Sequence, residues 1–184
     1  AVLLDLGVSS YQIDESGRGF SFQRDEPLDM RLDPAGPRTA ADLLNTLPES
    51  ELARVIFEYG DERHARRIAR AIVHRRALRT TADLVAAVRS AIPAAARQRG
   101  RAGAVHVATR TFQAVRMAVN DEPGALGAAL PQGARLLGSG GRMGVIAFHS
   151  GEDRIVKHAF RLLSGAEFAA VEPSPLTPGD DEVR

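Results

Sequence analysis

The chain has no cysteine, which excludes disulfide bonds, thiolate metal sites and cysteine nucleophiles. It contains no apolar run near the roughly 18 residues of a membrane-spanning helix, and its first residues do not resemble a secretory signal. Hydrophobic residues make up 44% and charged residues 26% of the 184 positions, which is ordinary for a soluble globular protein. The sequence therefore favours a cytoplasmic enzyme or binding protein, built as one domain or as one domain with an insertion.

Lysine is also scarce, because Lys157 is the only one, and almost all positive charge comes from arginine. The net charge of +1 is unevenly distributed. Residues 38–105 contain 13 arginines and 7 acidic residues, so this segment has a net charge of +6 and the remainder has −5. Such asymmetry suggests an anionic partner for the middle segment. A solvated arginine-rich surface is the alternative interpretation.

The first residues predict a β-strand that ends at a carboxylate. Residues 1–4 are apolar, as expected for a strand that is covered on both faces. Asp5 follows where the strand should end, and Gly7 allows a sharp turn. Ligands of open α/β sheets bind outside the carboxyl ends of the strands. The pattern therefore predicts a site at Asp5, and an Asp5 that merely caps a turn is the structural alternative.

A second buried strand is predicted over 142–148, and His149 and Ser150 follow it. Because the carboxyl ends of parallel strands share one edge of a sheet, we expect Asp5 and His149 to contribute to one site. A histidine with satisfied hydrogen bonds at a strand end is the alternative for His149. The segment from Ser150 to Asp153 resembles a capping box that begins a helix, and a last strand is predicted over 166–171.

Most of the sequence between these strands has a helical pattern. Helices are predicted over 39–47, 48–60, 62–76, 80–92, 109–120 and 124–137. In the third of these, one face is apolar, and another carries the cationic residues Arg63, Arg66, Arg67, Arg70 and His74. This stripe suits either an RNA backbone or plain solvent exposure. The loop 9–37 is too long for a plain connection, which favours a functional loop that carries Phe20 and Phe22.

Several short motifs occur in a specific order along the chain. They are Asp5-Leu-Gly-Val-Ser-Ser-Tyr-Gln12, Arg18-Gly-Phe-Ser-Phe22, Pro27-Leu-Asp-Met-Arg31, Phe57-Glu-Tyr-Gly60, Ala65-Arg-Arg-Ile-Ala-Arg70, Ala108-Thr-Arg-Thr-Phe-Gln113, Val119-Asn-Asp-Glu122, Phe148-His-Ser150 and Glu152-Asp-Arg-Ile-Val-Lys157. Each motif is weak alone. In this order they closely resemble the bacterial ribosomal RNA small-subunit methyltransferase H family, also called RsmH or MraW, from Val2 to about residue 178.

The resemblance implies a fold and a division of the chain. The implied fold class is α/β, a class I (Rossmann-like) methyltransferase fold dependent on S-adenosylmethionine, here with a partial sheet and an inserted all-helical domain. Residues 1–37 and 106–184 would form the methyltransferase core, and 38–105 the helical insert that recognises rRNA. Family members transfer a methyl group to N4 of a cytidine in the decoding centre of small-subunit (16S) rRNA. The implied partner is therefore the 30S subunit in the cytoplasm, and no metal or membrane is expected.

The matching motif positions also imply site residues. Asp5 and Gln12 would contact the cofactor, with Asp5 beside the methyl donor as the catalytic residue. Residues expected to contact the RNA are Ser9, Ser10, Phe20, Phe22, Arg66, Arg67, Arg70, Arg110 and His149. A carboxylate near the cytosine amino group would orient its lone pair. The base must leave its stack, and Phe20, Phe22 or Phe148 would pack on it in the pocket.

The chain departs from the family in what precedes Asp5. Family members have there an additional strand, a glycine-rich turn and an acidic residue on a second strand, which hold the cofactor. We therefore expect an N-terminally truncated member that alone binds the cofactor weakly or not at all. The alternative function is a non-catalytic RNA-binding or ribosome-assembly module that lacks the cofactor half.

Overall fold

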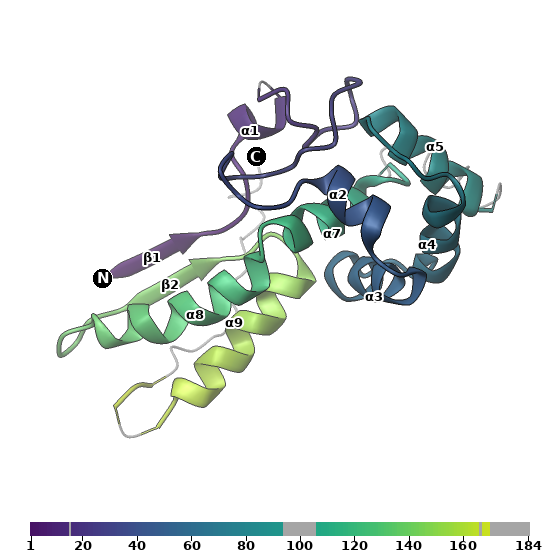
Figure 1. The fold of residues 1–184 in the computed structure, drawn as a ribbon. Helices are drawn as coiled ribbons and strands as arrows, with labels where there is room; N and C mark the ends of the chain where they lie inside the picture. Colours follow the sequence, from purple (N-terminus) through teal and green to yellow (C-terminus); the bar gives the residue numbers. More distant parts are fainter. Residues whose placement is uncertain (15, 94–105, 166, 170–184) are drawn as a thin grey trace, which may run out of the picture. The chain divides into compact units, whose positions relative to one another are not determined.

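The computed structural model describes residues 1–14, 16–93, 106–165 and 167–169 (Figure 1). They form two compact units, each with its own apolar core. The first unit, Gly7–Pro123, is helical, and the second combines Ala1–Leu6 with the chain from Gly124 onward. The helical unit is thus larger than the predicted insert 38–105, because the preceding loop and the helix after the insert pack into the same core. No helix of the described residues is long and apolar enough to cross a membrane.

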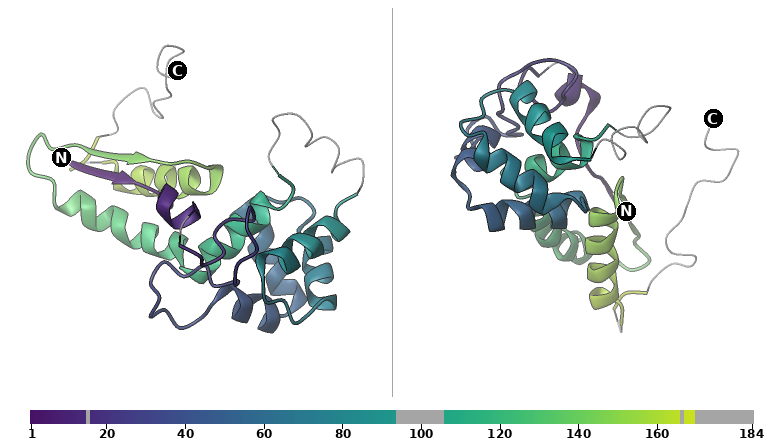
Figure 2. Two further views of the ribbon diagram at one scale, coloured as in Figure 1. Left: turned by 90° about the horizontal axis from the view of Figure 1, so that it is seen from above. Right: turned by 90° about the vertical axis from the view of Figure 1, so that its right-hand side faces the viewer.

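The second unit contains a two-stranded parallel sheet. Strand β1 (Val2–Asp5) pairs with β2 (Met143–Ile146), in a register that places Val2 opposite Met143 and Asp5 opposite Ile146. Helices α8 (Glu122–Arg135) and α9 (Ser150–Leu163) run alongside the strands (Figures 1 and 2). Leu126 and Leu130 of α8 and Val156 of α9 form a core with the strand residues Leu4, Leu6, Met143 and Val145.

The prediction that the first strand is covered on both faces was wrong for this unit. Side chains alternate between the two faces of a strand. Leu4 and Val145 face the helices, and their neighbours along each strand face away. Leu3 is 69% exposed and Ile146 44% exposed, because the described part of this unit has helices on one face only. An apolar run predicts a strand but does not say how many faces are covered.

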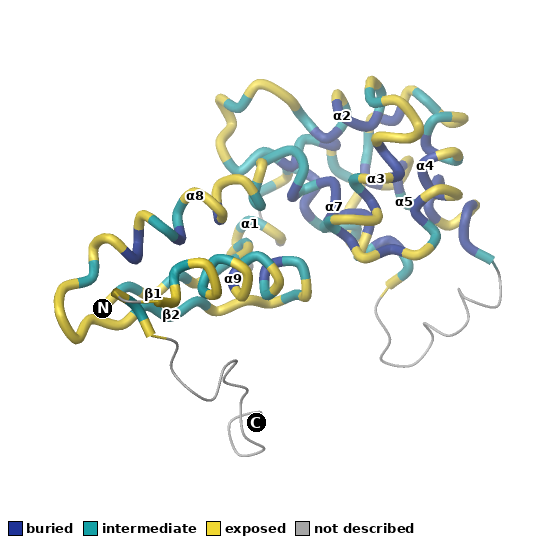
Figure 3. Tube along the Cα trace, turned by 90° about the horizontal axis from the view of Figure 1, so that it is seen from below, coloured by how far each residue is buried: buried dark blue, intermediate teal, exposed yellow. Residues whose placement is uncertain are grey.

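The helical unit contains six helices among its described residues. They are α1 (Ser10–Asp14), α2 (Ala40–Thr46), α3 (Glu49–Gly60), α4 (Ala65–His74), α5 (Thr81–Ala91) and α7 (Thr109–Val119). Figure 3 shows buried residues concentrated along α3, α4, α5 and α7. Helices α3 and α7 approach closely at Gly60, where a Cβ atom would overlap the carbonyl oxygen of Arg110. A glycine is therefore required at this crossing.

Local sequence signals set the ends of these helices. Helix α2 begins with a capping box, since Thr39 and Asp42 exchange hydrogen bonds across the first turn. Thr80 and Asp83 form the same arrangement at the start of α5. The third predicted helix is shorter than 62–76, because α4 begins only at Ala65. These signals are local, so the sequence alone is sufficient to find them.

The long loop before α2 is packed rather than open. Leu28 and Met30 are fully buried, and Met30 adopts a left-handed φ of 57°. Asp29 pairs with Arg31 through two contacts of 2.8 Å. Hydrogen bonding from the Arg31 guanidinium holds the pKa of Asp29 below its ordinary value. The loop thus belongs to the helical core, which explains why most of it, outside the short helix α1, needs no regular structure.

Asn120, directly after α7, fixes this loop to the helical core. Its Nδ2 donates to the Met30 carbonyl at 2.7 Å and to the Arg116 carbonyl at 2.8 Å, and its Oδ1 accepts from the Leu32 N–H at 2.7 Å. The side chain therefore satisfies three backbone groups and holds Met30 in its uncommon conformation.

We expect Asn120→Ala to lower the free energy of unfolding by about 2 kcal/mol, because partly buried loop groups lose their partners. Urea denaturation of this variant and of the control Gln132→Ala measures the change in the free energy of unfolding. Gln132 is an exposed amide that bonds one carbonyl of its own helix, so its loss should cost under about 0.5 kcal/mol. Equal stability of the two variants would contradict this role of Asn120.

Some segments lie at the limit of the described chain. The arginine-rich segment 97–103 and the acid-rich end 173–184 lie outside the described residues. The last predicted strand, 166–171, falls there in part, and its described residues 167–169 are not in a strand. Helix α8 begins two residues before the predicted 124, so Pro123 lies in its first turn, where proline is tolerated.

Candidate functional site

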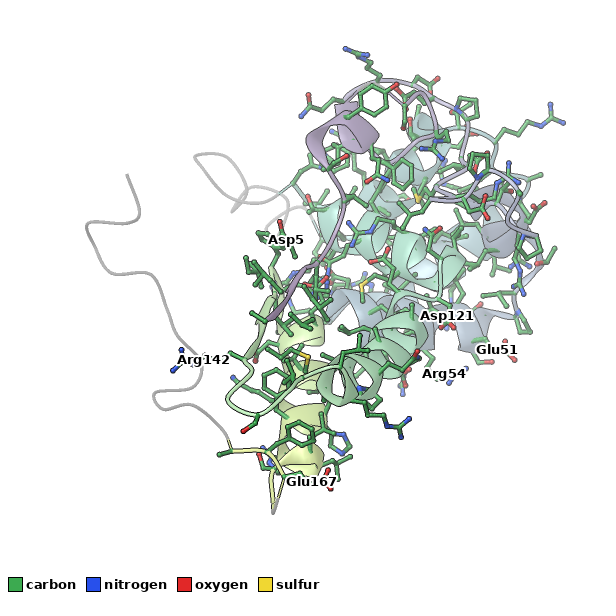
Figure 4. All side chains as sticks on the ribbon, turned by 90° about the vertical axis from the view of Figure 1, so that its left-hand side faces the viewer. Asp5, Glu51, Arg54, Asp121, Arg142 and Glu167 are labelled. Atoms are coloured by element: carbon green, nitrogen blue, oxygen red, sulfur yellow. The ribbon has the colours of Figure 1, made fainter. Side chains whose placement is uncertain are left out.

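The carboxyl edge of the sheet brings together residues that are far apart in the sequence. Asp5 ends β1 opposite Ile146, and the Leu6 N–H donates to the Ile146 carbonyl at 3.2 Å. The Asp5 side chain is exposed at this edge (Figure 4). Gly7 then turns the chain with a φ of 91°, a conformation that favours glycine. Because the strands are parallel, Asp5 and the residues after Ile146 lie at the same edge.

His149 begins α9 from this edge. Its Nδ1 accepts hydrogen bonds from the N–H groups of Gly151 at 3.2 Å and Glu152 at 3.3 Å. His149 is therefore the N-cap, one residue before the Ser150 that the sequence predicted. Accepting at Nδ1 leaves the proton of the neutral ring on Nε2. The imidazole thus has a structural task at Nδ1, whereas Nε2 is buried with no hydrogen-bond partner among the described residues, so the alternative of a fully satisfied histidine is met only in part.

Glu152 is the residue of this edge that the sequence reasoning missed. It is 5% exposed, and its Oε2 accepts from the Phe148 N–H at 2.9 Å. Its Oε1 lies 3.3 Å from Nε2 of His149, at an angle that does not form a hydrogen bond. Glu152 therefore fixes the backbone at Phe148, whose side chain is 69% exposed. No local pattern signals this contact, because the carboxylate accepts from the N–H of the residue before the N-cap His149.

Gln12 and Ser9 lie in the helical unit, where they begin α1. The Gln12 Oε1 accepts from the Ser9 N–H at 2.9 Å, and the Gln12 N–H donates to the Ser9 hydroxyl at 3.3 Å. Ser9-Ser-Tyr-Gln12 is thus a capping box, a signal that the sequence analysis did not use. Within the described part of the chain, the amide Nε2 of Gln12 has no hydrogen-bond partner. Ser10 is the first residue of α1.

The two predicted aromatic residues of the loop differ in access. Phe20 is 9% exposed, and the Arg18 guanidinium lies 5.3 Å from the centre of its ring. Phe22 is half-buried and stacks on His106, with ring centres 4.5 Å apart. A ring buried in the core has little surface for a ligand, so Phe22 is the more suitable of the two.

The predicted basic residues lie on exposed surface of the helical unit. Arg66, Arg67 and Arg70 project from α4 opposite its buried residues Ala65, Ile68, Ala69 and Ile72. Arg70 lies 3.5 Å from Glu49, and both side chains are largely exposed. Arg110 donates to the Asp61 carbonyl at 3.0 Å, at the left-handed residue that ends α3. Arg110 therefore supports a helix end as well as contributing charge.

The sequence model of one protein family, described as the MraW methylase family, matches residues 1–178. The chain belongs to this family. The predicted resemblance is thereby confirmed, and the family implies a class I methyltransferase fold. The parallel sheet agrees with the predicted α/β class.

Proteins of known annotation show the same relationship. The chain is 52% identical to the ribosomal RNA small subunit methyltransferase H of Kosmotoga olearia, over 98% of this chain and 60% of that protein. It is 57% identical to the protein of that name from Heliobacterium modesticaldum, over 86% of this chain and 50% of the relative. The corresponding protein of a Synechocystis strain is 47% identical over the whole chain and 58% of its own length. The chain thus spans between a half and three fifths of these relatives.

Proposed function

We propose that the full-length protein containing this chain is a methyltransferase that depends on S-adenosylmethionine and modifies small-subunit (16S) rRNA. The proposed target is N4 of a cytidine in the decoding centre, and the proposed partner is the 30S subunit in the cytoplasm. The names of the relatives support the reaction class and the RNA. The observation that carries the proposal is the exposed Asp5 carboxylate, which ends β1 at the same edge of the sheet from which Phe148 and the buried Glu152 follow β2.

The donor set of the chain suits the cofactor. S-Adenosylmethionine has an ammonium and a sulfonium group, which an exposed carboxylate such as that of Asp5 complements. Gln12 offers an amide nitrogen with no partner among the described residues, which suits a carboxylate or hydroxyl acceptor. When bound, the cofactor supplies an electrophilic methyl group. Asp5 and Gln12 are the residues proposed to hold it.

The residues of the sheet edge would prepare the amino group for reaction. The lone pair of the cytosine N4 atom is delocalised into the ring, so this nitrogen is a poor nucleophile. Asp5 would accept a hydrogen bond from the amino group, direct its lone pair outward and receive the proton that the methylated nitrogen loses. Phe148 would pack on the extruded base. Glu152 and His149 would act as positioning residues, because they fix the backbone that presents Phe148.

RNA binding outside the reaction site is assigned to the helical unit. We propose that 38–105 is an inserted RNA-recognition domain and that 1–37 and 106–184 form the catalytic core. Arg66, Arg67, Arg70 and Arg110 would contact phosphates, since all four are exposed cations. Ser9, directly before α1, and Ser10, its first residue, are proposed to contact the substrate.

Methyl incorporation tests this function. Full-length protein is incubated with unmodified 30S subunits and radiolabelled S-adenosylmethionine, and the modified nucleotide is mapped by mass spectrometry. We expect cofactor-dependent label at N4 of a single cytidine. RNA binding without transfer at any cofactor concentration would instead support the non-catalytic RNA-binding or ribosome-assembly module. Label at a different base would reject the proposed target.

A further inference from the structure

A groove of about 450 Å³ lies in the helical unit between loop residues 22–25 and the exposed face of α5. This volume lies within the range of roughly 300–1,000 Å³ that is typical of ligand sites. Ala82 and Ala86 make the groove hollow, because they are one helical turn apart and their side chains are small. Phe22 lines it from the loop, and Arg89 lines it one turn beyond Ala86.

The walls of the groove are held in place by hydrogen bonds. The Thr81 hydroxyl donates to the Arg24 carbonyl at 2.7 Å and accepts from the Glu26 N–H at 3.0 Å. The Asp25 carboxylate accepts from the Ala82 N–H at 3.1 Å. Thr81 is buried, so these bonds form one fixed junction between loop and helix. The groove therefore exists before any ligand binds, which lowers the entropic cost of binding.

Phe22 presents a rigid aromatic ring to this groove. Its ring is stacked on His106 and meets Phe112 edge-on, with centres 5.3 Å apart and planes at 78°. Phe112 is buried in the core, so the orientation of Phe22 is determined by packing on two sides. A fixed aromatic ring beside an open groove suits an unstacked nucleobase, because every base has an aromatic face to place against it.

The charges around the groove favour an anionic ligand. Arg24 and Arg89 line it, and Arg89 forms no ion pair with any residue of the described chain. Burial, together with the nearby charge of Arg89, holds the pKa of His106 below its ordinary value. Among the described lining residues the acidic group is Asp25, which is already bonded to the first turn of α5. The Arg89 guanidinium can therefore meet a phosphate beside a bound base.

We propose that this groove binds one unpaired nucleotide of the RNA substrate. The base lies against Phe22 and over Ala86, and Arg89 contacts the adjoining phosphate. The inference rests on the proposed function, since it takes RNA as the substrate. It adds a subsite in the helical unit that anchors the substrate by binding a nucleotide only where the RNA is single-stranded.

The test uses full-length protein and two labelled RNA probes, a single strand of about ten nucleotides and a duplex of the same length. Ala86→Leu fills the groove without changing charge, and the exposed position tolerates a good helix former. Ala128→Leu on α8 is the matched control, because it is the same change at another exposed helical alanine. Circular dichroism and the unfolding midpoint establish that each variant is folded.

We expect Ala86→Leu to weaken single-strand binding about 10-fold, the effect of losing one stacked base. The duplex affinity and the salt dependence should stay unchanged. Arg89→Gln should weaken binding and lower the slope of log K against log salt by about 0.7, whereas Arg54→Gln on α3 should do neither. The proposal would be overturned if the Ala86→Leu variant bound both probes as tightly as the unchanged protein, or if its affinity for both probes fell by the same factor.

The outcome is separable from that of the proposed function. Methyl transfer to 30S subunits is measured for the unchanged protein in the same experiment. RNA binding without methyl transfer would reject the proposed enzymatic function. The comparison of the two RNA probes would then still decide whether the groove binds a nucleotide. Methyl transfer together with an unaffected Ala86→Leu variant would reject the groove alone.

Discussion

We expect Asp5→Ala to reduce methyl transfer to 30S subunits by at least about 100-fold in the full-length protein, because general acid–base groups typically contribute 10² to 10⁴. Asp5 is exposed at the end of β1, and no hydrogen bond of the described chain depends on its carboxylate. Its removal should therefore leave the unfolding midpoint within about 1 °C of the original value, as for a neutral surface substitution. Single-turnover rates at saturating cofactor measure the effect on the chemical step.

A second substitution separates two ways in which Asp5 can act. Asp5→Asn keeps an oxygen that accepts a hydrogen bond but removes the negative charge and the capacity to take a proton. If orientation of the amino group is sufficient, this variant should retain more activity than Asp5→Ala. If Asp5 must receive the proton, both variants should be equally slow. Asp33→Ala, at an exposed loop carboxylate, is the control for a general loss of charge.

Full activity of Asp5→Ala would contradict the catalytic role and return Asp5 to the alternative of a turn residue. Cofactor affinity is measured in parallel by calorimetry, because Asp5 is also proposed to bind S-adenosylmethionine. A loss of affinity with an unchanged maximal rate would keep the binding role and remove the catalytic one. The two roles of this carboxylate are thus tested independently.

The parts of the fold that the sequence predicted are those encoded by neighbouring residues. The helix starts predicted near residues 39 and 80 are confirmed, and each is fixed within one turn, by Thr39 with Asp42 and by Thr80 with Asp83. The apolar face of α4 is equally local, since its period alone separates core from surface. Strand β1 and its terminal Asp5 were predicted for the same reason, from a short apolar run followed by a carboxylate and a glycine.

What the sequence did not predict depends on contacts between distant segments. The burial of Phe20 and Met30 follows from a loop that Asn120 fixes some 90 residues further along. His149 rather than Ser150 caps α9, because Nδ1 accepts two backbone N–H groups that a sequence pattern cannot assign. Glu152 was missed for a related reason, since only the fold shows that its carboxylate is buried against the Phe148 backbone.

The same distinction applies to the RNA-binding residues. Sequence pattern alone gave the arginine stripe of α4, but a solvated face would have the same pattern. The structure shows that Arg66, Arg67 and Arg70 are exposed and that, among the residues it describes, only Arg70 of these three forms an ion pair, at 3.5 Å from Glu49. Such a weak surface pair contributes little and leaves the guanidinium available. A charge-reversal experiment is therefore the way to distinguish function from solvation.

We expect simultaneous reversal of Arg66, Arg67 and Arg70 to glutamate to weaken the binding of 30S subunits or rRNA about 100-fold at physiological salt. Each arginine that neutralises a phosphate contributes roughly 0.7 to 0.9 to the slope of log K against log salt. The slope should therefore fall by about 2 to 3 when three such contacts are lost. Filter binding over a series of salt concentrations measures both quantities.

The control must carry the same change in net charge. Arg135, Arg154 and Arg161 are three exposed arginines of α8 and α9, and none of them belongs to the α4 stripe. Reversing them changes the net charge of the protein by the same six units. If RNA binds to the α4 face, the control triple should lose far less affinity, and its salt slope should fall by less than about 1. Equal losses in both triples would show that net charge alone attracts the RNA, and the arginines of α4 would then be ordinary solvated side chains.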